Sequence, residues 1–160
     1  MTGEIPLERM PRLTSLLNAA EGTVTVTMEA GVTEQNLRFI GGHLEVAVEM
    51  ICQRCMEPML IPLVVDFRLG LVHSEAQDLE LPQGYEPLLI VEDEIAIAEL
   101  VADELILALP LVALHKEVRQ CEALGFTLPT GEEPPVGAEK AHPFATLSTL
   151  LKDSKDKESN

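Results

Sequence analysis

The chain has 160 residues, of which 46% are hydrophobic and 24% are charged, so it has the composition of a globular protein with one domain and a core. It carries 27 acidic and 11 basic side chains, for a formal net charge of -16. Nucleic-acid affinity depends largely on lysine and arginine displacing counterions, so this charge disfavours direct binding to RNA or DNA and docking on an anionic membrane. A basic protein would be attracted.

The sequence also bears on the cellular compartment. The longest apolar runs, residues 59–65 and 105–114, are too short to span a bilayer. The N-terminus lacks the basic segment and apolar region of a secretory signal. Three cysteines, an odd number, suit a reducing compartment better than a disulfide framework. We therefore expect a cytoplasmic protein without a membrane segment.

The first expected element is a short helix within residues 5–20, confined mainly to its later part by Pro6 and Pro11. Alternation of apolar and polar residues then predicts strands, and Gly41-Gly42 is typical of a tight hairpin turn between two of them. The expected strands are 22–29, 35–40, 43–51, 58–72 and 88–91. Pro62 would be accepted only at an edge or a bulge.

The clearest helix pattern spans residues 97–109, where apolar residues recur every three or four positions and Pro110 ends the run. We expect the remaining segments to be a loop at 74–87, a surface segment at 125–141, one or two helical turns at 143–151 and a disordered tail at 152–160.

These elements predict an α+β fold. We expect a twisted antiparallel sheet or a partly closed barrel, with one main packed helix, short flanking helices and a single domain over residues 1–151. The expected core residues are Val24, Val26, Leu44, Val46, Val48, Val64, Phe67, Leu100, Val101, Leu105 and Leu109.

The acidic residues are concentrated in one part of the chain. Residues 69–115 contain ten acids and no lysine or arginine. Such a region can steer a cationic partner, although a solvated surface would give the same pattern. The residues we expect to bind a basic partner are Glu92, Asp93, Glu94, Glu99, Asp103 and Glu104.

Cys52 and Cys55 form a C-x-x-C pair at a strand end, the spacing with which two thiolates reach one metal ion. His115 and Cys121 would complete a tetrahedral Cys3His set if the fold brought them to this pair. A structural zinc ion there would contribute on the order of 10 kcal/mol to folding. The alternative is that the thiols pack as small buried hydrophobes and that His115 lies on the surface.

Several segments together resemble one protein family. They are Cys52-Gln-Arg-Cys55 with Glu57-Pro58, then Tyr85-Glu86-Pro87, then the run from Val101 to Pro110 with His115 and Cys121 behind it, and His142-Pro143-Phe144-Ala145. In order and spacing they resemble the YceD family of large ribosomal RNA subunit accumulation proteins. The resemblance implies a non-enzymatic role in accumulation of that RNA.

Three functions follow as hypotheses. The first is an accumulation factor that binds a basic ribosomal protein or assembly factor through its acidic surface. The second is a direct RNA-binding module with a zinc knuckle, using Arg38, Arg54 and Arg68. The third is an enzyme, which the sequence disfavours because it lacks a hydrolytic elbow, a phosphate-binding glycine loop and an H-E-x-x-H helix.

Overall fold

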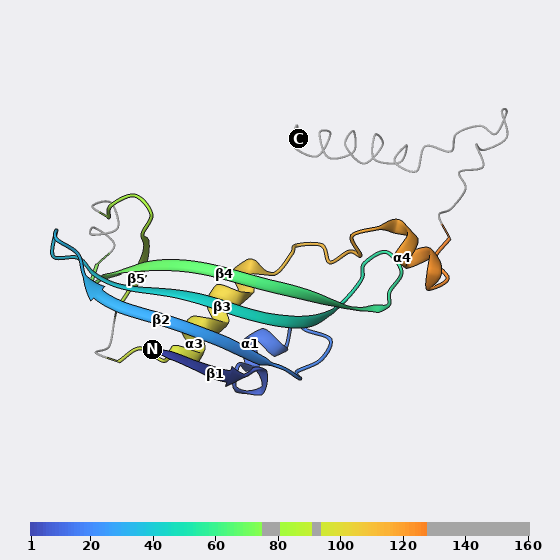
Figure 1. The fold of residues 1–160 in the computed structure, drawn as a ribbon, viewed down its shortest axis with the longest axis horizontal. Helices are drawn as coiled ribbons and strands as arrows, with labels where there is room; N and C mark the ends of the chain where they lie inside the picture. Colours follow the sequence, from blue (N-terminus) through green and yellow to red (C-terminus); the bar gives the residue numbers. More distant parts are fainter. Residues whose placement is uncertain (75–80, 91–93, 128–160) are drawn as a thin grey trace, which may run out of the picture. The chain divides into compact units, whose positions relative to one another are not determined.

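The computed structural model describes residues 1–74, 81–90 and 94–127, and residues 1–127 form one compact unit. Five strands make one sheet in the order β1-β2-β3-β4-β5 (Figure 1). Their bounds are β1 Thr2–Pro6, β2 Thr23–Val32, β3 Arg38–Ile51, β4 Pro58–Val72 and β5 Glu86–Leu89. The expected α+β fold class is confirmed.

The described helices are a 3-10 turn, η1, at Leu7–Arg9, and the α-helices α1 at Pro11–Thr14, α3 at Ile97–Ala108 and α4 at Val118–Ala123. Figure 1 shows α1 and α3 on the same face of the sheet. The helix expected at 97–109 is confirmed, with Leu109 as its C-cap. No helix in the described ranges is both long enough and apolar enough to cross a bilayer.

Neighbouring strands from β1 to β4 run antiparallel, but β5 runs parallel to β4, from Leu69 opposite Glu86 to Val72 opposite Leu89. The prediction of a purely antiparallel sheet is therefore wrong for the last strand. A parallel neighbour requires a crossover, which the connection at 73–85 provides. The barrel alternative is also wrong, because β1 and β5 are opposite edges of an open sheet.

The predicted hairpin turn at Gly41-Gly42 is wrong, since both glycines lie inside β3. The chain reverses instead between Thr33 and Leu37, where the N–H of Thr33 donates to the carbonyl of Leu37 at 2.8 Å. Asn36 adopts φ +63°, a left-handed conformation that asparagine accepts more readily than most residues. The expected strands 35–40 and 43–51 are thus one strand.

The glycine at position 42 is needed for packing. A Cβ atom there would overlap the ring of Phe67, which is buried beside it on β4. The close approach of this aromatic ring explains a glycine within a central strand.

The N-terminal segment also differs from expectation. Residues 2–6 pair with β2 as strand β1, and the helical part is reduced to η1 and α1. Pro6 precedes η1 and Pro11 begins α1, so the prolines prevent one continuous helix through this segment. Leu7, Met10 and Leu13 from this segment are all fully buried.

Nine of the eleven expected core residues are buried in one cluster shared by the sheet, α3 and the segment of η1 and α1, and Leu109 is partly buried against it. Val64 is the exception, with 63% of its surface exposed. Alternation along β4 turns Leu63, Phe67 and Leu69 inward and therefore turns Val64 outward. Its prediction as a core residue is wrong for this reason.

The strand expected at 58–72 is confirmed, and the one expected at 88–91 is observed at 86–89. Since β5 pairs only with residues 69–72, Pro62 lies on a stretch of β4 without a second strand neighbour among the described residues. The expectations for residues 128–160, including the helical turns at 143–151 and the tail at 152–160, lie outside the described ranges. The single-domain prediction reaches into that part and stays a prediction.

We predict that Gly42→Ala destabilises the protein by about 1–3 kcal/mol, because the added methyl group must displace the buried Phe67 ring. Gly3→Ala is the matched control, since a Cβ at Gly3 has no atom within 4 Å. Urea unfolding measures both changes. Equal stability of the two variants would contradict the packing argument.

Candidate functional site

The turn between β3 and β4 presents the C-x-x-C pair at one end of the sheet. The N–H of Cys52 donates to the carbonyl of Glu57 at 2.9 Å, and the N–H of Met56 donates back to the carbonyl of Cys52 at 2.8 Å. Met56 has φ +62°, which closes the turn. This backbone geometry places both cysteines at the end of the sheet that the segment after α3 reaches.

The segment after α3 brings the second half of the cluster. The N–H of Gln53 donates to the carbonyl of Ala113 at 2.8 Å, which fixes the returning segment two residues before His115. Cys121 follows on α4, whose first turn is closed by a capping box between Glu117 and Gln120.

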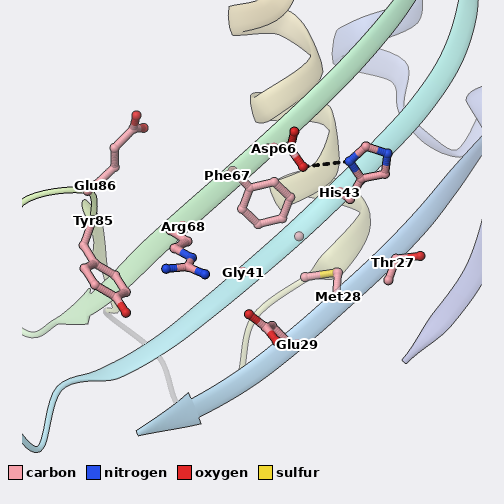
Figure 2. A pocket seen from close by; sticks show the side chains of 12 residues that line it. Thr27, Met28, Glu29, Gly41, His43, Asp66, Phe67, Arg68, Tyr85 and Glu86 are labelled. Carbon is pink, nitrogen blue, oxygen red and sulfur yellow. Dashed lines mark hydrogen bonds and ion pairs between the residues drawn. The ribbon is translucent and has the colours of Figure 1, made fainter. Parts of the chain in front are cut away.

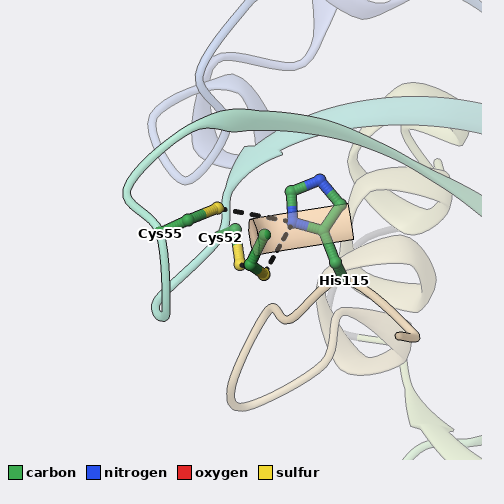
Figure 3. Close-up of side chains that lie close together, drawn as sticks. Cys52, Cys55 and His115 are labelled. Atoms are coloured by element: carbon green, nitrogen blue, oxygen red, sulfur yellow. Dashed lines mark hydrogen bonds between the residues drawn. The ribbon is translucent and has the colours of Figure 1, made fainter. Parts of the chain in front are cut away.

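The structure brings together all four residues expected to bind metal. Figure 3 shows Cys52, Cys55 and His115 close together. One ligand atom from each of Cys52, Cys55, His115 and Cys121 lies within 4.8 Å of every other. The sulfurs of Cys52 and Cys121 are 3.8 Å apart, and His115 Nδ1 is 3.5 Å from the sulfurs of both Cys55 and Cys121. We call these four residues the Cys–His cluster.

The electrostatics of the Cys–His cluster favour a sulfur anion at Cys52. Burial acts to raise the pKa of the Cys52 thiol, but backbone hydrogen bonds from Cys55, His115 and Arg54 outweigh burial and lower it to about 5. Burial raises the pKa of Cys121, and the nearby thiols of Cys55 and Cys52 raise it further. A bound cation would relieve this crowding of negative charge.

The six predicted partner-binding acids have different environments. Glu92 and Asp93 lie outside the described residues, and Glu94 is exposed just before α3. Arg12 on α1 forms ion pairs with Asp103 at 2.7 Å and with Glu99 at 3.6 Å.

Glu104 faces a groove between α3 and β5 with a volume of about 460 Å³. Burial raises its pKa, and the carboxylates of Glu86 and Asp103 raise it further. The prediction omitted Glu86 from the binding set, because only the pairing of β5 with β4 brings it to α3.

A second groove lies on the outer face of the sheet, opposite the helices, with a volume of about 740 Å³ (Figure 2). His43 Nδ1 is 2.7 Å from Asp66, and its Nε2 is 3.1 Å from Glu45. Tyr85 lies at the other end of the groove. Sequence reasoning missed this arrangement, since His43 and Asp66 meet only through the register of β3 and β4.

The arginines proposed for RNA binding do not form one patch. Arg38 begins β3, whereas Arg54 lies beyond the opposite end of that strand in the C-x-x-C turn. Arg68 lines the outer groove beside the carboxylates of Glu29 and Asp66. A continuous basic surface is therefore not built from these three side chains.

The described chain has an α+β fold, and its mixed sheet carries the Cys–His cluster at one end. These features define a small domain with a candidate metal centre. Comparison with known proteins identifies the family. The model of the family described as "Large ribosomal RNA subunit accumulation protein YceD" matches residues 40–151. A protein of that name from Haemophilus influenzae (strain ATCC 51907 / DSM 11121 / KW20 / Rd) is 38% identical over 138 residues, covering 82% of this chain and 79% of the relative.

The chain therefore belongs to the YceD family, as the sequence motifs indicated. No solved structure matches it.

We predict that His43→Gln alters the pH dependence of folding stability. The hydrogen bond to Asp66, followed by that to Glu45, raises the pKa of His43 above its usual 6.5. The folded chain binds the proton of His43 more tightly than the unfolded chain does. The protonated side chain therefore stabilises the folded state fully below pH 6.5, and this contribution is lost as pH rises through the raised pKa.

Urea unfolding of the wild type and of His43→Gln between about pH 5 and about pH 9 measures the difference in their free energies of unfolding. An NMR titration of His43 in the wild type gives its pKa directly. Identical pH profiles for the wild type and the variant would contradict the predicted coupling.

Proposed function

We propose that this protein is a non-enzymatic factor that supports accumulation of the large-subunit ribosomal RNA, and that it acts by binding a basic ribosomal protein or assembly factor. The role is supported by membership of the YceD family and by the name of the Haemophilus influenzae relative. The mechanism is supported by the charge of the chain. At a net charge of -16, the RNA backbone is repelled and a basic protein is attracted.

The groove between α3 and β5 is the observation that carries this proposal. Its apolar part includes Leu88 and Leu100, and its acidic side chains come from both elements. The carboxylates that line it are Glu86, Glu94, Glu99, Asp103 and Glu104. No lysine or arginine is among the described residues that line this groove.

This combination suits a protein segment that carries both apolar and basic side chains. The apolar residues of the groove would be removed from water, and the carboxylates would attract the cationic groups. A cation beside Glu104 would also relieve its repulsion by Glu86 and Asp103. Arg12 already neutralises part of the α3 surface, so we assign the main role to Glu86 and Glu104.

Direct RNA binding through the C-x-x-C turn is the alternative. It would depend on Arg54, because Arg38 and Arg68 lie elsewhere on the sheet. Charge reversal at Arg54 and Arg68 that left RNA affinity unchanged would exclude it. The separation of the arginines and the net negative charge make this function less well supported than partner binding.

The non-enzymatic part of the proposal is supported by the outer groove. Both ring nitrogens of His43 already contact carboxylates. Among the described residues that line this groove there is no serine or cysteine for His43 to activate. Thr27 lies opposite His43 in the register of β2 and β3, but the contacts to Asp66 and Glu45 leave His43 no free ring nitrogen to take a proton from that hydroxyl.

We predict that the full-length protein, used as bait in a lysate of its native cell, captures a basic ribosomal or assembly protein at low salt and loses it at high salt. The double variant Glu86→Gln/Glu104→Gln should capture several-fold less, because it neutralises the groove. Mass spectrometry identifies the protein, and RNA sequencing measures RNA in the same eluate.

The matched control is Glu8→Gln/Glu29→Gln, which removes the same charge from exposed positions away from the groove. Capture of ribosomal RNA without any protein partner would count against the mechanism. Deletion of the gene that left the ratio of large-subunit to small-subunit RNA unchanged would count against the role itself.

A further inference from the structure

The Cys–His cluster is the main chemical feature that partner binding at the α3–β5 groove does not use. All three cysteines of the chain belong to it. Cys52 and Cys121 are fully buried, whereas Cys55 is partly buried. Three sulfurs and one imidazole nitrogen converge from segments about 60 residues apart in the chain.

Three of the six distances between the ligand atoms match a metal-centred tetrahedron, and all six are within 4.8 Å. Zn–S bonds of about 2.3 Å and a Zn–N bond of about 2.0–2.1 Å would separate two sulfurs by about 3.8 Å and a sulfur from the nitrogen by about 3.5–3.6 Å. The structure has 3.8 Å between Cys52 and Cys121, and 3.5 Å from His115 Nδ1 to each of two sulfurs. A disulfide would need sulfurs about 2.0 Å apart.

We propose that Cys52, Cys55, His115 and Cys121 bind one structural Zn²⁺ ion, with His115 coordinating through Nδ1. Three thiolates and one imidazole form a ligand set that selects zinc among common cellular cations, since magnesium and calcium prefer oxygen. Four protein ligands complete the tetrahedron and leave no open position for a reacting water. The ion is therefore structural and not catalytic.

Arg54 is the outer-sphere residue of this site. Three thiolates exceed the charge of Zn²⁺ by one negative unit, and Arg54 Nη1 lies 3.7 Å from the sulfur of Cys121. Its guanidinium offsets that charge and donates to a ligand sulfur, as hydrogen-bonding groups around metal ligands commonly do. This position in the C-x-x-C turn gives Arg54 a role that does not involve RNA.

The ion would attach the chain after α3 to the end of the sheet. Within the described part of the chain, α4 has six residues, too few for a stable isolated helix. The backbone hydrogen bond from Gln53 to Ala113 joins the same two regions. Zinc coordination by Cys121 and His115 would therefore hold residues 113–123 in place.

The test begins with untagged full-length protein purified under reducing conditions without added metal. Elemental analysis and native mass spectrometry should find one zinc per chain. Replacement by Co²⁺ should give the absorption bands of a tetrahedral cobalt–thiolate site. Cys52→Ser, Cys121→Ser and His115→Ala should each lose most of the bound metal, and His43→Ala is the control that should retain it.

Two variants keep the test decisive if a ligand variant fails to fold. His115→Cys should still bind zinc, because four cysteines also form a tetrahedral site. Arg54→Gln should remain folded and bind zinc about 10-fold or more weakly. Removal of zinc from the wild type with a chelator should increase hydrogen exchange in residues 113–123 far more than in β2 and β3.

Three results would overturn the proposal. They are reduced protein that stays metal-free in excess ZnCl2 with three reactive thiols, a disulfide between Cys52 and Cys121 as the stable form, and iron in place of zinc in the purified protein. None of these results depends on capture of a partner, so failure here and failure of the proposed function are distinguishable.

Discussion

The contact between helix α3 and the inner face of the sheet is the interaction on which the other features of the described chain depend. Leu100, Val101 and Leu105 of α3 belong to the same buried cluster as inward-facing residues of β2, β3 and β4. Burial of apolar area at about 25 cal/mol per Å² makes such a face the main source of stability. It holds α3 against the sheet, and Pro110 after the C-cap residue Leu109 ends the helix, so the two together position both candidate sites.

The beginning of α3 and its exposed side, with β5, form the acidic groove. The end of α3 directs the following segment to the C-x-x-C turn, where Ala113 accepts a hydrogen bond from Gln53. One packed helix therefore separates a proposed partner site from a proposed metal site. Under the proposed function, binding of a basic protein at the acidic groove would account for a chain of net charge -16 in a family named for RNA accumulation.

Prediction from sequence succeeded where the signal was local. The two-residue alternation identified β2, the run rich in leucine, isoleucine and valine identified β4, and the three-to-four-residue spacing identified α3. It failed where a distant contact overrides local preference. Gly41 and Gly42 are typical of a turn, yet the ring of Phe67 requires glycine at position 42 within β3. The parallel direction of β5 also has no local signal, because it depends on the path of the crossover.

The sequence by itself determined the periodic elements, the excess of acidic residues and the four residues suited to metal binding. It also determined the family, because motif order and spacing do not require coordinates. Only the tertiary structure decided that Cys52 and His115 meet, and that Glu86 joins Glu104 beside the groove. Residue spacing sets which face of an element a side chain occupies, whereas packing between elements sets which faces come together.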